Sequence, residues 1–239
     1  MSIRGTLKVG LAAGLLAGLV LGLYIMLVMG PIIDEAKAIE GGEEPVPASV
    51  TKAVAFTGGI VTGVLICIPF ALVFPAVDSI LPWRSVIRKA WAYGALAFII
   101  FSLLPLLAVP GAPPGVERNL SVEERQFWYI GTMLSAFGGV LAGFGLYYFL
   151  TPKARSLWAK RVLLAVSLLI VSFLWLLPFL LKPEITAIPG DVPPELIQTF
   201  SYLTILEWVL FWSVLSTALG LLWSRLEATP ESSASQIPA

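Results

Sequence analysis

The sequence predicts an all-α, polytopic membrane protein, and two observations carry this prediction. Of the 239 residues, 58% are apolar and 13% are charged, whereas a soluble domain has about 45–50% apolar and about 25% charged residues. The apolar residues also form six long runs, each near the roughly 20 residues that a helix needs to cross the hydrocarbon core. We therefore expect the lipid bilayer to be the immediate surroundings of this chain.

Charged residues or clusters of Pro and Gly bound each of the six runs. The runs are too long and continuous for alternating barrel strands, so helices are the form that satisfies the backbone within lipid. We expect a single helical domain over residues 1–226 and a polar, disordered tail over residues 227–239. The predicted spans are residues 9–29, 50–75, 90–109, 127–150, 162–181 and 202–223.

The connections between the spans differ in charge, which predicts the orientation. Lys and Arg gather before the first span, in residues 76–89 and 151–161, and after the last span. Acids gather in residues 30–49, 110–126 and 182–201. Basic connections stay in the cytoplasm, so both termini are predicted to be cytoplasmic (N-in/C-in) in a multi-pass protein of the cell membrane.

Missing residues exclude several classes of function. The chain has no histidine and a single cysteine, Cys67, which excludes a Ser-His-Asp triad, histidine-ligated metals and an intrachain disulfide. It has no G-K-[ST] phosphate loop and no G-x-G-x-x-G motif after a strand, so neither an ATPase nor a nicotinamide enzyme is expected. We expect no enzyme activity, no tightly bound cofactor and no nucleic-acid partner.

Three predicted spans carry small residues at a spacing of four, which places them along one helix face. Such a stripe lets a neighbouring backbone approach closely where lipid offers no hydrophobic driving force. We expect helix packing within the chain, with a homo-oligomeric interface or a groove for a partner helix as alternatives. The residues are Gly10, Gly14, Gly18 and Gly22, then Ala55, Gly59 and Gly63, then Gly131, Ser135, Gly139 and Gly143.

Two sets of carboxylates are candidates for binding a cation. Glu207 lies well inside the sixth predicted span, where a carboxylate is costly and suggests a functional site; the alternative is that it meets interfacial water or a loop arginine. The acidic stretch at residues 34–44 includes Glu35 and Glu40, and carboxylates suit hard, octahedral cations; the alternative is a solvated loop. Arg125 is expected to pair with an acid of the first outer loop.

Four landmarks follow one another along most of the chain. They are Gly30-Pro31 leading into Asp34-Glu35 and Glu40, then Leu104-Pro105 to Pro113-Pro114, then Arg125-Gln126 to Gly131-Thr132, and finally Val192-Pro193 leading to Trp223 and Arg225. In this order and spacing the chain resembles the CbtA family, which is predicted to be the membrane subunit of a cobalt transporter.

The resemblance implies uptake of Co²⁺ together with a small single-span partner, CbtB, that bears a histidine-rich terminus. This chain departs from the family by one additional predicted span and by its lack of histidine, the usual nitrogen ligand for Co²⁺. Recognition of the ion then falls to the partner or to Glu207, Glu35, Glu40, Cys67, Met26 and Met29. The alternative function is a non-transporting accessory subunit of a larger membrane complex, such as a respiratory one.

The predicted topology can be tested by labelling from one side of the membrane. Labels at Arg155 or at the C-terminus should react from the cytoplasm, and labels near Glu43 or Pro113 should react from outside. Opposite accessibility at any of these positions would contradict the orientation with six spans.

Overall fold

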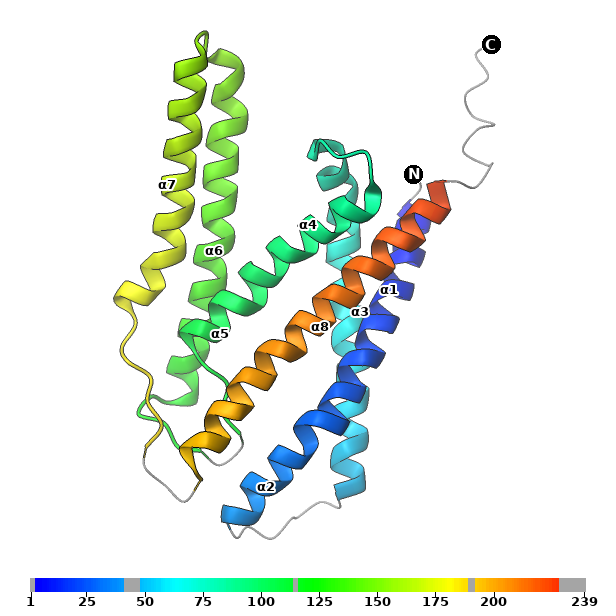
Figure 1. Ribbon diagram of the computed structural model, residues 1–239, viewed down its shortest axis with the longest axis vertical. Helices are drawn as coiled ribbons and strands as arrows, with labels where there is room; N and C mark the ends of the chain where they lie inside the picture. Colours follow the sequence, from blue (N-terminus) through cyan, green and yellow to red (C-terminus); the bar gives the residue numbers. More distant parts are fainter. Residues whose placement is uncertain (1–2, 41–47, 114–115, 189–191, 228–239) are drawn as a thin grey trace. The chain divides into compact units, whose positions relative to one another are not determined.

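The computed structural model describes residues 3–40, 48–113, 116–188 and 192–227, which are almost entirely helical (Figure 1). Within these ranges there is no β-strand, only an isolated bridge between Arg118 and Ala187. Six helical segments are long and apolar enough to cross a membrane, and each overlaps one predicted span, which confirms the predicted fold class. They are Ile3–Ile39, Val50–Ile80, Val86–Ala108, Val122–Lys153, Leu157–Leu181 and Pro194–Glu227.

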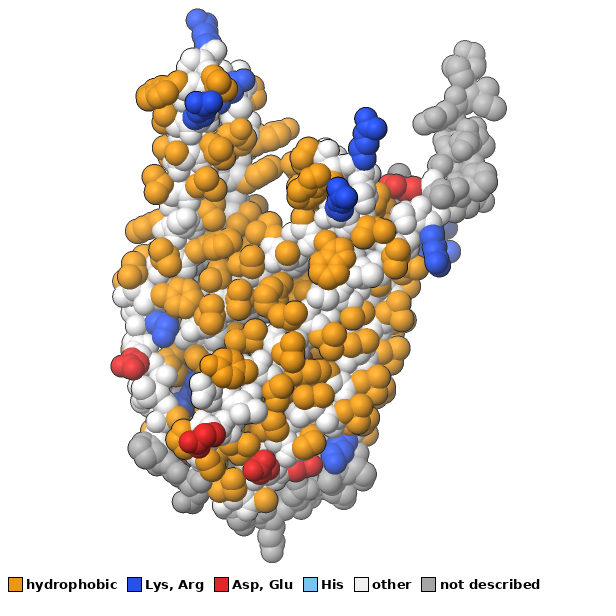
Figure 2. Space-filling view, in the orientation of Figure 1, with side chains coloured by type: hydrophobic (Ala, Val, Ile, Leu, Met, Phe, Trp, Pro, Cys, Tyr) orange, Lys and Arg blue, Asp and Glu red, His pale blue; other side chains and the backbone are white. Residues whose placement is uncertain are grey.

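The segments extend beyond the apolar runs that predicted them. The first consists of α1 (Ile3–Tyr24), a π-helical turn η1 (Ile25–Met29) and α2 (Gly30–Glu40). The last, α8, runs from Pro194 to Glu227 with Glu195 in its first turn, where Pro and an acid are favourable. Hydrophobic side chains cover the visible face of these helices (Figure 2), as expected for surfaces that meet lipid.

Two compact units make up the described chain. The first contains α1, η1, α2, α3 (Ala48–Ile80), α4 (Val86–Phe98) and α8. The second contains η2 (Ile99–Leu103), α5 (Leu104–Ala108), α6 (Val122–Leu150), η3 (Thr151–Lys153) and α7 (Leu157–Leu181). The boundary between α4 and η2 coincides with the start of a π-helical turn.

In the first unit, α1 and α3 pack with their backbones in contact. A Cβ added to Gly14 would lie 2.7 Å from the Gly63 carbonyl oxygen, and one added to Gly18 would lie 2.9 Å from the Gly59 carbonyl oxygen. Gly10 and Gly22 are equally close to α3. No larger residue fits without displacing backbone, so the glycines allow the two helices to approach this closely.

In the same unit, α8 packs against both α1 and α4, and Figure 1 shows it, in orange, running between them. The contact with α4 again uses glycine, because a Cβ added to Gly94 would overlap the Ser216 Oγ. Where α3 meets α4, the Phe70 ring stacks on Tyr93 with centroids 4.1 Å apart. The contacts with α1 and α4 fix the position of α8 within the unit.

In the second unit, α6 and α7 form an antiparallel hairpin joined by η3. A capping box begins α6: Ser121 Oγ accepts from the Glu124 N–H, and the Glu124 side chain accepts from the Ser121 N–H. Gly139 and Gly143 face α7, where a Cβ on Gly143 would lie 2.7 Å from the Ser167 carbonyl oxygen. Gly131 has nothing within 4 Å of an added Cβ.

The contact between α1 and α3 predicts a strong difference between two glycine substitutions. Gly14→Leu should lower the free energy of unfolding by about 3 kcal/mol or more, because the side chain has no room between the backbones. Gly138→Leu on α6 serves as the matched control, since nothing lies within 4 Å of its added Cβ. Thermal unfolding in detergent measures both; equal stability of the two variants would contradict the contact.

Candidate functional site

Glu207 lies far from either end of α8. At a rise of 1.5 Å per residue, it is about 20 Å along the axis from Pro194 and about 30 Å from Glu227. Its side chain is partly buried in the first unit. Glu207 therefore lies in the interior of a helix that is long and apolar enough to cross a membrane and that packs on two others.

Tyr24, at the end of α1, contacts α8 at the level of Glu207. Its hydroxyl donates a hydrogen bond of 3.0 Å to the Leu203 carbonyl, which is the same carbonyl that accepts from the Glu207 backbone N–H in a regular α-helix. Tyr24 and Glu207 also interact electrostatically. Sequence reasoning missed Tyr24, although a tyrosine within an apolar span needs a partner for its hydroxyl.

A π-helical turn, η1, follows Tyr24 directly. The Gly30 N–H bonds to the Ile25 carbonyl, five residues earlier, and Pro31 has no N–H to give to the Leu27 carbonyl. Pro31 thus accounts for the widened turn, a feature found frequently at functional sites. The turn contacts α3 and α8, and Met29 within it is 3% exposed. Met29 therefore faces the interior of the unit.

Among the described residues, no outer acid forms a metal centre with Glu207. Glu35 is exposed on α2, and its neighbour Asp34 forms an ion pair of 3.5 Å with Lys52. Glu40 ends α2, and its side chain lies outside the described residues, as do Glu43 and Glu44. Across the described part of the chain, no group of three His, Cys, Asp or Glu could hold a metal ion.

Cys67 has a packing role in the structure. Its side chain is fully buried, and its Sγ donates a hydrogen bond of 2.6 Å to the Gly10 carbonyl. The thiol thus fills the contact between α1 and α3 and has no open face to offer an ion. A buried, protonated thiol of this kind is a poor metal ligand, since the thiolate is the form that binds metal.

In the second unit, two loops are joined by short hydrogen bonds. Asn119 donates to the Glu184 carbonyl and accepts from the Thr186 N–H. Beside it, burial lowers the pKa of Arg118 from its ordinary value, and the nearby charge of Arg125 lowers this pKa further. Arg125 itself donates to the Ser121 carbonyl at 3.4 Å, and the described residues contain no ion pair that includes it.

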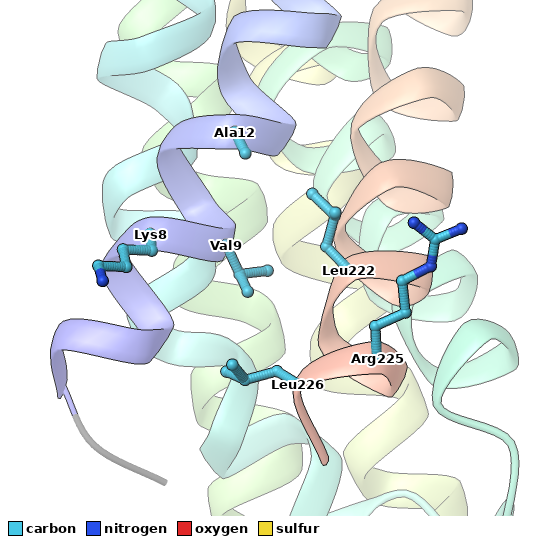
Figure 3. Close-up of a pocket in the computed structure, with 6 residues that line it drawn as sticks. All are labelled: Lys8, Val9, Ala12, Leu222, Arg225 and Leu226. Atoms are coloured by element: carbon cyan, nitrogen blue, oxygen red, sulfur yellow. The ribbon is translucent and has the colours of Figure 1, made fainter. Parts of the chain in front are cut away.

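A groove of about 290 Å³ separates α1 from α8 near the end that carries both termini (Figure 3). Val9, Leu222 and Leu226 point toward the space between the helices, while the side chains of Lys8 and Arg225 point away from it on opposite sides. The groove is lined by the apolar side chains of Val9, Ala12, Leu222 and Leu226 and by the two basic residues Lys8 and Arg225.

The arrangement defines a polytopic helical membrane protein with a carboxylate in the interior of one membrane-length helix, and its described residues contain no group of three possible metal ligands. A family model described as a probable cobalt transporter subunit (CbtA) matches residues 3–224, nearly the whole chain. The protein belongs to this family. Searches of curated proteins and of solved structures found no match.

The packing of Cys67 predicts that its sulfur does not take part in metal handling. Cys67→Ala removes the sulfur but keeps a small apolar side chain between α1 and α3. Cobalt uptake, measured with radioactive cobalt at equal protein level, should be unchanged. Loss of uptake in a variant of normal thermal stability would instead make Sγ a ligand.

Proposed function

We propose that this protein is the membrane subunit through which a divalent cation, Co²⁺, enters the cell. The family supports the cobalt transporter system, and the six membrane-length helices support a multi-pass protein of the cell membrane. The position of Glu207 within α8 is the observation that links the proposed transport to a particular residue. In this proposal both termini are cytoplasmic, and energy comes from outside this chain, whose sequence has no phosphate loop.

Glu207 is the group that takes the ion across the membrane in this mechanism. A single carboxylate with few neighbouring ligands binds a cation weakly, and conduction requires a site that the ion can leave. Tyr24 holds the end of α1 against α8 at this level through its bond to the Leu203 carbonyl. Opening of η1, which contains the π-helical bond from the Gly30 N–H to the Ile25 carbonyl, would change access to Glu207.

Glu35 and Glu40 collect the cation in this proposal. Both belong to α2, which follows η1 in the same helical segment. Their charges raise the local concentration of cations within a Debye length of about 8 Å at physiological ionic strength. They attract the ion to the segment that leads to Tyr24 but do not carry it through.

Selectivity for Co²⁺ is assigned to a partner. Nitrogen and sulfur ligands prefer Co²⁺ over Mg²⁺ and Ca²⁺, and this chain has no histidine. A small single-span subunit with a histidine-rich terminus, similar to CbtB, would supply these ligands. A second copy or a partner helix could contact α6 at Gly131, the stripe glycine that has free space beside it.

The role of Glu207 predicts the phenotype of its amide variant. Glu207→Gln keeps the shape of the side chain and removes its charge, so uptake of radioactive cobalt should nearly vanish while the protein level holds. Glu195→Gln is the matched control, because Glu195 is exposed in the first turn of the same helix and should leave uptake close to wild type.

Three outcomes of this experiment decide the proposal. Normal uptake by Glu207→Gln would make the intramembrane carboxylate structural. Equal loss in the two variants would indicate a general effect of charge on α8. No uptake by the wild-type protein, even with its histidine-rich partner present, would reject transport and favour the accessory subunit of a larger membrane complex.

The collecting role of the outer acids predicts a different phenotype. The double variant Glu35→Gln with Glu40→Gln should raise the cobalt concentration needed for half-maximal uptake at low salt and leave the maximal rate unchanged. The difference from wild type should shrink at high salt, because salt screens the field of exposed charges. A lower maximal rate at saturating cobalt would contradict this role.

A further inference from the structure

A continuous cluster of aromatic rings fills the first unit on one side of Glu207. It begins with Trp208, the next residue on α8, and ends with Trp223, about 22 Å further along the helix axis. Each ring centroid lies between 4.1 and 6.1 Å from the next, and the rings come from α3, α4 and α8. In order of contact, this ring cluster consists of Trp208, Phe211, Trp212, Phe70, Tyr93, Phe74 and Trp223.

The two halves of α8 differ in how tightly they are packed. None of the residues from Pro194 to Leu210 is buried, whereas eight residues from Phe211 to Trp223 are buried. Among these eight, Ser216 is the one polar side chain. Glu207 lies just before the boundary between the halves, so the ring cluster occupies the closely packed side of this carboxylate.

We propose that the ring cluster is a hydrophobic gate between Glu207 and the end of the unit that carries both termini. The inference rests on the proposed function, in which Glu207 takes the ion across the membrane. A cation that left Glu207 in this direction would lose its oxygen ligands and water among the rings, which is costly, and a hydrophobic constriction also excludes water. Ring faces can attract a cation, but Phe70 and Tyr93 cover each other's faces, with centroids 4.1 Å apart and an interplanar angle of 9°.

Two prolines of α3 lie beside the rings that this helix contributes to the gate. Pro69 precedes Phe70 and Pro75 follows Phe74, and both prolines lie inside the helix. A proline within a helix removes a backbone hydrogen bond and favours a kink. A change of bend at Pro69 would move the Phe70 ring away from its partners on α4 and α8. The gate thus has a point at which it can open.

The test measures from which side of the membrane a thiol reagent reaches position 207. The full-length variant Glu207→Cys, with Cys67→Ala to remove the other thiol, is treated with a membrane-impermeant thiol reagent in sealed vesicles of either orientation. With the ring cluster intact, it should not react from the side that the termini face. Adding Phe70→Ala with Tyr93→Ala should raise the rate from that side by about tenfold or more, which corresponds to a barrier lowered by about 1.4 kcal/mol.

A second aromatic pair of the chain provides the matched control. Phe144 and Tyr148 on α6 are also a stacked Phe–Tyr pair and do not belong to the ring cluster, so Phe144→Ala with Tyr148→Ala should leave the rate unchanged. Because the loss of two packed rings can prevent folding, Tyr93→Ala is also measured alone. The Tyr93 side chain is only partly buried, and this variant should raise the same rate to a smaller extent.

Two results would overturn the gate. One is reaction of Glu207→Cys from the side of the termini while all rings are present; the other is an equal rate from that side in the ring variants and in the control variant. The assay contains no cobalt, so the gate and the proposed function can fail separately. A gated reaction at position 207, together with no cobalt uptake by the wild type, would reject transport and leave the barrier formed by the rings.

Discussion

Direct contact between the backbones of α1 and α3 is the constraint on which the first unit depends. Lipid gives helices no hydrophobic reason to associate, so van der Waals contact and hydrogen bonds must hold them. Gly14 and Gly18 permit this contact, and the Cys67 thiol adds a hydrogen bond to the Gly10 carbonyl within it. With α1 held on α3, Tyr24 at its end is placed to bond α8 at the Leu203 carbonyl.

This packing gives Glu207 unusual surroundings for a carboxylate. It lies within a long helix that packs against α1 and α4, and Tyr24 interacts with it electrostatically. A storage or catalytic metal site would gather several ligands around the ion. In the proposed mechanism, the single carboxylate of Glu207 instead binds the ion briefly and then releases it.

Much of the fold could be predicted from the sequence because long apolar runs and the Ser121 capping box are local signals. The packing partners of the individual helices could not be predicted from the sequence. Residues spaced by four turn by about 400°, so a stripe drifts by about 40° per step; Gly143 therefore meets α7, while Gly131, three steps away, faces open space. The bond from Tyr24 to Leu203 joins positions far apart in the chain. Glu207 is conspicuous in the sequence as a lone acid in an apolar run, and its role in binding the ion stays a prediction.

The electronic absorption spectrum of Co²⁺ bound to the purified protein tests the central claim most directly, because the spectrum reports the ligands of the ion. If Glu207 holds Co²⁺ with oxygen neighbours and water, the bound ion should show the weak bands of octahedral oxygen coordination. These bands should be absent from Glu207→Gln and present in Cys67→Ala. Intense tetrahedral bands with sulfur-to-cobalt charge transfer, or an unchanged spectrum in Glu207→Gln, would contradict the account.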